Sequence, residues 1–273
     1  MPSIEPVGAA ERRRMSSVLR QWIVERSLAA HVGHIGSALS IADIVTALFG
    51  GVMHRPGTND PERDRFILAK GHAALALYAA LHYTAAIEAQ TFAGFCADGS
   101  LLGVHPEAGA PGVDVGTGSL GQGLSIGCGL ALAFRRRRMG ARVFVLMSDA
   151  ECNEGQVWEA AQFAAHHRLD AVRAVVDLNG LQALGPTREV ISLDLIAVWR
   201  AMGWETAEVD GHETEALVTA LAAESSEGRP RVVVARTVLG KGVPFMENRL
   251  EWHYRNLTPE LAAEALEYLR ADG

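Results

Sequence analysis

The sequence has few cysteines, and they are widely separated. Three occur among 273 residues, Cys96, Cys128 and Cys152, with no C-x-x-C pair. This spacing offers no disulfide framework and is typical of buried thiols in a reducing compartment. An apolar leader segment is also missing, because charged residues follow at positions 11–14. We therefore expect a cytoplasmic protein.

An excess of positive charge is missing too. The formal net charge is -7 and the pI is ≈ 5.8, so no general field attracts nucleic acid or an anionic membrane. One stretch, Val115 to Phe134, is uncharged over twenty residues, but it contains six glycines together with polar side chains. Such a segment is too weakly apolar for a membrane span. We expect a buried helix there, and neither a nucleic-acid nor a membrane partner.

What the sequence does contain is a regular alternation of strand and helix patterns. Short β-branched runs predict strands at residues 66–69, 142–148, 171–178, 205–209 and 231–237. Helical patterns separate them, at residues 72–88, 120–138, 153–167, 193–202 and 214–223. This alternation predicts an α/β fold, a three-layer α/β/α arrangement around a mainly parallel sheet. Ligands of such sheets bind at the carboxyl ends of the strands.

Neither internal repeats nor a flexible linker divides the chain. Residues 1–273 are therefore expected to form one domain with an N-terminal helical extension and a C-terminal tail from Gly240. The extension begins with a predicted helix from Ala9 to His31. Ser40 then has the character of an N-cap for the next helix.

The clearest chemical signal follows the second predicted strand. Asp149 comes directly after this strand, and Asn179 ends the next one, thirty residues later. Since parallel strands end at the same edge of a sheet, the two side chains can meet over one ion, with a loop carbonyl near Leu181 as a third oxygen donor. Hard oxygen donors suit Mg²⁺, and a helix that starts beside Asp149 can take a phosphate. Alone, each residue would be an ordinary N-cap or turn residue.

This arrangement resembles the thiamine-diphosphate signature, although Ser148, Ala150 and Leu178 replace its usual residues. Further stretches resemble the N-terminal cofactor module of the transketolase family and its separate N-terminal subunit in split bacterial enzymes. The resemblance covers about residues 15–254. It is carried by four sequences, GHIGS at 33–37, DRFILAKGHA at 64–73, VHPE at 104–107 and GTGSLGQG at 116–123.

The resemblance implies a role for each matching residue. Three catalytic histidines would surround the thiazolium carbon and the substrate hydroxyls, namely His34, His72 and His105. A fourth, His253, would lie in a closing loop that brings it and Lys241 toward the diphosphate. Cofactor contacts would come from Gly118, Ser119, Leu120, Asp149, Ala150, Glu151, Asn179 and Lys241. Mg²⁺ would be held by Asp149, Asn179 and Leu181, and Glu154 would lie at a subunit interface.

The resemblance also implies a partner, because the family's pyrimidine-binding domain, with the glutamate that activates the cofactor, has no counterpart in this sequence. The expected enzyme transfers a two-carbon ketol unit from a ketose to an aldose, on sugars or sugar phosphates, once a C-terminal transketolase subunit is bound. Two alternatives remain. One is a subunit of another thiamine-diphosphate enzyme, such as a 2-oxo acid dehydrogenase α subunit or a deoxyxylulose-phosphate-synthase-like protein. The other is a degenerate subunit that serves assembly only.

Overall fold

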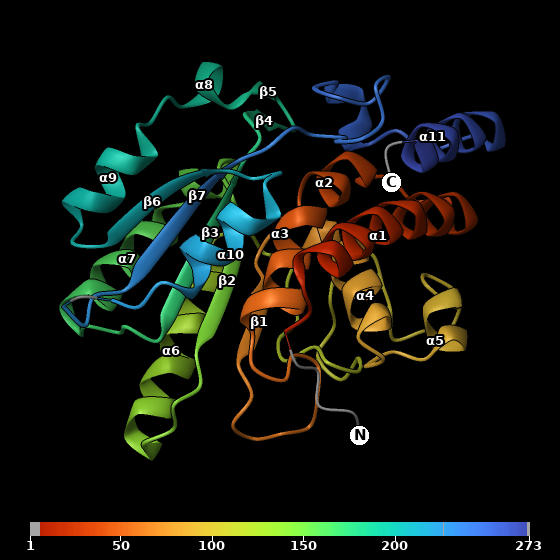
Figure 1. Ribbon diagram of the computed structural model, residues 1–273. Coiled ribbons are helices and arrows are strands. Elements are labelled where there is room, and N and C mark those ends of the chain that lie inside the picture. The colour runs from red at the N-terminus through yellow and green to blue at the C-terminus, as the bar shows by residue number, and fades with distance from the viewer. Residues whose placement is uncertain (1–5, 226, 272–273) are drawn as a thin grey trace.

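The centre of the molecule is a parallel sheet of five strands (Figure 1). The computed structural model describes residues 6–225 and 227–271. The strands lie in the order β1, β2, β3, β7, β6, and every neighbouring pair is parallel. Their bounds are β1 Arg65–Leu68, β2 Val143–Ser148, β3 Val172–Leu178, β6 Glu205–Asp210 and β7 Arg231–Arg236. The expected α/β fold with a parallel sheet is confirmed.

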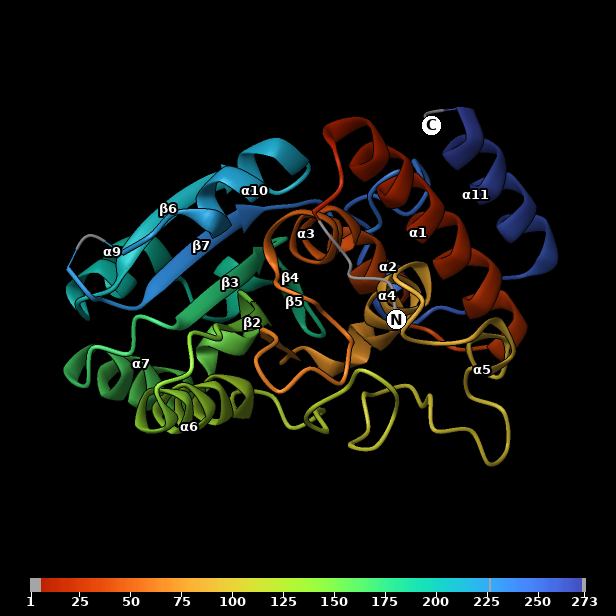
Figure 2. The same ribbon diagram turned by 60° about the horizontal axis from the view of Figure 1, so that its bottom comes forward.

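Helices cover both faces of this sheet (Figure 2). One face packs on α6 (Gln122–Arg137), α7 (Gly155–His166) and α9 (Leu195–Ala201). The other packs on α3 (Ala42–Ala47) and α10 (Thr214–Ala222). Beyond them lie α1 (Ala9–Ala30), α2 (Ile35–Ser40), α4 (Ala74–Tyr83) and α11 (Pro259–Ala271). The predicted three layers are therefore present.

Shorter elements connect these layers. Single turns of helix occur at η1 (Leu48–Val52), η2 (Gly71–Ala73), α5 (Ala89–Ala93), η3 (Ala150–Asn153), α8 (Thr187–Val190) and η4 (Leu250–His253). A small hairpin pairs β4 (Leu181–Gln182) with β5 (Gly185–Pro186). This hairpin, α2 and the segment after β7 gather at the top of Figure 1, where the carboxyl ends of the strands lie. Segments far apart in the sequence thus meet at the edge where ligands are expected.

Close packing of α6 on the sheet depends on two glycines. A Cβ added at Gly123 would lie 2.4 Å from Cβ of Ala69, and one at Gly127 would lie 2.6 Å from Cγ2 of Val145. Side chains at these two positions would push α6 away from β1 and β2. Within the described part of the chain, no helix has the length and apolar character needed to cross a bilayer. Of the glycine-rich stretch, the residues from Gln122 form α6, one side of which packs on the core, whereas the residues before Gln122 form a loop. The predicted buried helix is thus confirmed in part.

The structure corrects two local predictions. Ser40 is the last residue of α2 and caps no helix; its hydroxyl donates to Oδ2 of Asp177 at 2.8 Å. Tertiary contact thus outweighs the local preference of serine for helix starts. The segment from Gly240 is more than a tail, because it ends in the thirteen-residue helix α11. This helix packs against α1 through Ala262, Ala265 and Leu269.

Candidate cofactor site

The carboxyl ends of β2 and β3 bring the predicted metal ligands together. Ser148 pairs with Asp177 in the sheet register, and the Asp149 amide donates to the Asp177 carbonyl at 3.1 Å. The next residues of both strands therefore emerge side by side. A cavity of about 620 Å³ opens here, lined by Asp149, Asn179 and Leu181 among others. Asp149 and Asn179, which were predicted to meet because each lies at the end of a strand, therefore line the same cavity.

Asp149 is a buried carboxyl group with spare bonding capacity. Its Oδ2 accepts from the Gly180 amide at 3.1 Å, whereas its buried Oδ1 has no hydrogen-bond partner within the described chain. Burial, with a contribution from the nearby charge of Asp177, raises the pKa of Asp149 to about 6. A cation beside Oδ1 would compensate both the unmet acceptor and the unfavourable charge.

Asn179 is held in one orientation by its neighbours. Its Nδ2 donates to Oδ2 of Asp177 at 2.9 Å, and its Oδ1 accepts from the Leu181 amide at 3.0 Å. The amide oxygen keeps a second lone pair for a ligand. Among the described residues, no cluster of three or more His, Cys, Asp or Glu side chains is arranged to hold a metal. A cation here would be bound by one carboxylate, neutral oxygens of the protein and oxygens of the ligand itself, which suits Mg²⁺ with a diphosphate.

A buried ion pair that the sequence analysis missed lies beside these groups. Lys70, two residues after β1, is fully buried, and its Nζ lies 2.5 Å from Oδ2 of Asp177. The same carboxylate accepts from Ser40, Asn179 and the hydroxyl of Thr237. The charge of Lys70 also opposes the rise in the pKa of Asp149 that burial causes, and it contributes to lowering the pKa values of His34, His72 and His253. Its position in the AKGH stretch, directly after a predicted strand, indicates that Lys70 lies at the ligand edge of the sheet but not that it is buried.

Three of the four predicted histidines form a cluster. The ring centroids of His34, His72 and His253 lie 5.2–5.5 Å apart. Burial lowers the pKa of His253 to about 4 and that of His72 well below its ordinary value. Burial and the charge of His105 lower the pKa of His34. The clustered rings are therefore neutral at physiological pH, and the Nδ1 atoms of His34 and His253 are buried with no partner in the described chain.

The predicted ring-binding loop lies against this cluster. Gly71, which precedes His72, approaches the loop so closely that an added Cβ would be 3.0 Å from the Gly118 amide. A Cβ at Gly118 would in turn lie 3.3 Å from the His105 ring. Ser119 and Leu120 follow on the exposed side of the loop. Gly118 has φ 149°, a conformation that favours glycine, so backbone and histidines here can lie close to a flat ligand.

Glu151 is buried between this loop and the end of β2. Its Oε1 accepts from the Gly121 amide at 2.8 Å, and its Oε2 from the Ser148 amide at 3.4 Å. Burial raises its pKa to about 7 despite these hydrogen bonds. Glu151 thus joins the strand end to the loop before α6.

The remaining predicted residues lie at the margins of the site. Ala150 begins η3 and is partly exposed, whereas Glu154 is exposed at the start of α7, beside Gly121. Lys241 lies elsewhere: its Nζ is 3.9 Å from Oε1 of Glu247, and it lines a different cavity together with Arg20. The structure therefore groups Lys241 with Arg20 rather than with Asp149.

Comparison with known proteins decides between the possible families. A model of the transketolase thiamine diphosphate binding domain matches residues 11–269. The chain belongs to the transketolase family. The 6-deoxy-6-sulfo-D-fructose transketolase subunit of Clostridium sp. (strain MSTE9) is 37% identical over 96% of this chain and 97% of its own length. An apulose-4-phosphate transketolase subunit of Phocaeicola vulgatus is 36% identical over 90% and 89%, respectively.

Solved transketolases have the same fold as this transketolase-family chain. Transketolase from Campylobacter jejuni superposes with a TM-score of 0.90 at 26% identity over 97% of the present chain. The chain spans only 43% of the length of that structure's chain. It therefore corresponds to the cofactor-binding domain of the family, with the length of the separate subunits. The readings as a 2-oxo acid dehydrogenase subunit or a synthase-like protein are not supported.

Proposed function

We propose that this chain is the thiamine-diphosphate and Mg²⁺ binding subunit of a two-chain transketolase that transfers two-carbon ketol units between sugars. The observation that carries the proposal is the coincidence of unmet polar atoms at one sheet edge: Oδ1 of Asp149 and the Nδ1 atoms of His34 and His253. Buried polar atoms without partners are rare. Asp149 lines the cavity of about 620 Å³, and the unmet atoms of the two histidines belong to the ring cluster; together they support a site that a polar, charged ligand completes.

The described residues divide between the two ends of such a ligand. Asp149, Asn179 and the Leu181 carbonyl would bind Mg²⁺ together with diphosphate oxygens, while the buried Lys70 ammonium compensates Asp177, the carboxylate that orients Asn179. Gly118, Ser119 and Leu120 would contact the cofactor's rings, and Glu151 fixes that loop through the Gly121 amide. When bound, thiamine diphosphate supplies the carbon nucleophile and electron sink that permit cleavage of the ketose bond next to the carbonyl.

The neutral histidines would handle the protons of the sugar. His34, His72 and His253 can each accept a proton at one ring nitrogen and donate at the other, which hydroxyl and carbonyl groups of a ketose require. Their lowered pKa values keep the rings uncharged. His105 adjoins them next to Gly118. The names of the relatives, which refer to a sulfo sugar and a sugar phosphate, favour sugars with an anionic group as substrates.

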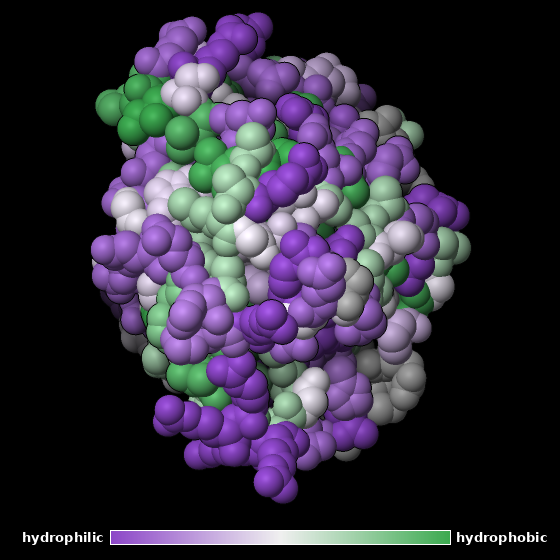
Figure 3. Space-filling view, turned by 90° about the vertical axis from the view of Figure 1, so that its left-hand side faces the viewer, coloured by the Kyte–Doolittle hydropathy of each residue, from purple (hydrophilic) through white to green (hydrophobic). Residues whose placement is uncertain are grey.

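A partner chain with the pyrimidine-binding domain is part of this proposal. We infer a heterotetramer of two chains of each kind in the cytoplasm, with Glu154 and the exposed side of α6 at the contact. Apolar residues exposed around α8 support a covering partner, because two of them, Ile191 and Leu193, line the cavity of Asp149. Figure 3 shows the side of the molecule that is at the left of Figure 1, and apolar side chains gather near its top, at the height of α8 in Figure 1. The exposed large apolar side chains of this segment are Leu184, Val190, Ile191 and Leu193.

Calorimetric titration tests the binding function directly. Thiamine diphosphate with Mg²⁺ is titrated into the complex of this chain with its partner, and into the same complex with Asp149→Ala. We expect saturable, Mg²⁺-dependent binding that the variant abolishes, because the only anionic protein ligand proposed for the metal is removed. Equal binding by both complexes would refute the assignment of the metal site.

A further inference from the structure

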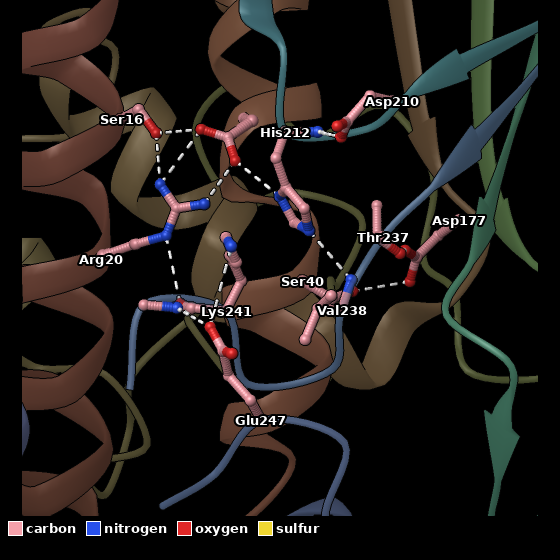
Figure 4. A network of polar contacts seen from close by, with 12 residues as sticks. Ser16, Arg20, Ser40, Asp177, Asp210, His212, Thr237, Val238, Lys241 and Glu247 are labelled. Atoms are coloured by element: carbon pink, nitrogen blue, oxygen red, sulfur yellow. Dashed lines mark hydrogen bonds and ion pairs between the residues drawn. The ribbon is translucent and has the colours of Figure 1, made fainter. Parts of the chain in front are cut away.

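A polar network outside the cofactor cavity connects the loop after β7 to α1 and α3 (Figure 4). His212, in the turn between β6 and α10, is its central residue. Its Nδ1 lies 2.9 Å from Oδ2 of Asp43, and its Nε2 lies 2.9 Å from the amide nitrogen of Val238. A backbone N–H can only donate, so Nε2 must carry the lone pair and Nδ1 the proton. The contacts therefore select a single neutral tautomer of His212.

The partner of that proton is a fixed carboxylate. Burial by itself would raise the pKa of Asp43, but the charge of Arg20 and the surrounding hydrogen bonds hold it well below the ordinary value. Arg20 binds both carboxylate oxygens, and Ser16 donates to one of them. Arg20 also donates from Nε to the Lys241 carbonyl at 3.3 Å. The orientation of His212 is thus set by α1 and α3 rather than by the loop that it binds.

Val238 lies between two residues that reach the cofactor site. On one side, the hydroxyl of Thr237 donates to Asp177, the carboxylate that also binds Lys70 and Asn179. On the other, Leu239 is buried against α2, where a Cβ added at Gly36 would be 2.9 Å from its Cγ. The Gly240 amide donates to the Gly36 carbonyl at 3.0 Å. Displacement of Val238 would therefore disturb both Asp177 and the helix that follows His34.

We propose that His212 is a positioning residue for the cofactor site. By accepting from the Val238 amide, it holds the loop at residues 237–243 so that Thr237 orients Asp177 and Leu239 packs behind α2. The ring of His212 bonds to Asp43 and Val238, neither of which is a predicted cofactor ligand. Its cavity of about 760 Å³, which Arg20, Asp43 and the predicted ligand Lys241 also line, is distinct from that of Asp149. The consequence for cofactor binding rests on the function proposed above, whereas the consequence for the loop does not.

Two amide substitutions separate the two ring nitrogens. The oxygen of Gln in His212→Gln can reach the place of Nε2 and accept from Val238, but the contact to Asp43 is lost. The amide of Asn in His212→Asn can take the place of Nδ1 and donate to Asp43, but it leaves the Val238 amide without an acceptor. Each variant loses one hydrogen bond, so a merely structural role predicts similar effects on overall stability.

The experiment measures hydrogen exchange of the segment 237–246 in the full cofactor-free chain, and then thiamine diphosphate affinity of the assembled complex. We expect His212→Asn to accelerate exchange of this segment and weaken cofactor binding about tenfold, the equivalent of one hydrogen bond. His212→Gln should stay within about threefold of the wild type in both measurements. Equal exchange in the two variants would overturn the proposal. Exchange is read without cofactor, so a wild type that binds no cofactor would refute the proposed function and leave this contrast intact.

Discussion

Asp149 and Glu151 are buried carboxyl groups whose charge the cofactor-free fold disfavours. Burial raises the pKa of Asp149 from 3.8 to about 6 and that of Glu151 from 4.5 to about 7. A raised pKa means that the folded chain holds the proton more tightly than the unfolded chain. The cost of the Asp149 charge is absent below about pH 3.8, grows up to about pH 6 and is constant above it.

An Asp149→Asn substitution separates this cost from the benefit of metal binding. We expect the unfolding free energy of the cofactor-free chain to rise by about 1–3 kcal/mol at pH 8, because a buried charge is removed, and the gain to vanish towards pH 4. Mg²⁺-dependent cofactor binding should be lost in the same variant. Urea unfolding at several pH values, with and without cofactor and Mg²⁺, measures both effects. A variant that gains no stability at pH 8 yet retains Mg²⁺ would contradict this account.

Lys70 and Asp177 give a second prediction at this scale. Lys70→Met leaves the Asp177 carboxylate buried without its cation, so we expect a loss of about 3–5 kcal/mol in unfolding free energy. Asp177→Asn in the Lys70→Met background should restore part of that loss, because it removes the uncompensated charge. The cycle is completed with Asp177→Asn alone. Simple additivity of the two single changes would show that the pair is not coupled.

Among the elements, α6 offers a matched pair of glycines. Gly123→Ala would place a methyl group 2.4 Å from Cβ of Ala69, and we expect it to destabilise the chain by about 1–3 kcal/mol through overpacking. An added Cβ at Gly129, in the same helix, meets nothing within 4 Å. Gly129→Ala should therefore stabilise the chain by about 0.5–1 kcal/mol through helix propensity. Thermal or urea unfolding of the two variants compares them; a change of the same sign in both would refute the packing argument.

Sequence patterns predicted the elements where burial repeats regularly. All five strands of the sheet were found within two residues. Continuous apolar runs such as Val143–Ser148 are buried, whereas the edge strand β6 mixes charged and apolar residues and is only partly buried. Helix ends were less exact: α4 ends at Tyr83, before the predicted Glu88. The serine at position 40 was misassigned, since its partner Asp177 lies 137 residues away. Local patterns do not contain such tertiary contacts.

The candidate site was predictable to a similar degree. Asp149 and Asn179 could be predicted because each lies at the end of a strand. The three clustered histidines could be predicted from the family resemblance. Burial of Lys70 could not be read from its sequence, because a lysine after a strand is ordinarily solvated. The network of His212 was missed because it joins residues of α1, α3 and two loops, which no local pattern connects. Lys241 remains a predicted ligand, and the structure places it with Arg20 and Glu247.

For the molecule as a whole, the central claim is a division of labour between two chains. This chain spans 43% of the Campylobacter jejuni transketolase chain but 97% and 89% of the related subunits. Its loop at Gly118 and Leu120, which would meet the cofactor's rings, is exposed in the chain by itself. The glutamate that activates the cofactor in the family would have to come from the partner. We therefore expect the cofactor to become catalytically active only in the complex of the two chains.

The most direct test mixes purified chains. Two-carbon transfer from a ketose donor to an aldose acceptor is measured with thiamine diphosphate and Mg²⁺ for this chain alone, for a partner carrying the pyrimidine-binding domain alone, and for the two together. We predict transfer only in the mixture, and its loss when Asp149→Ala replaces the wild type. Full transfer by this chain alone would contradict the division of labour.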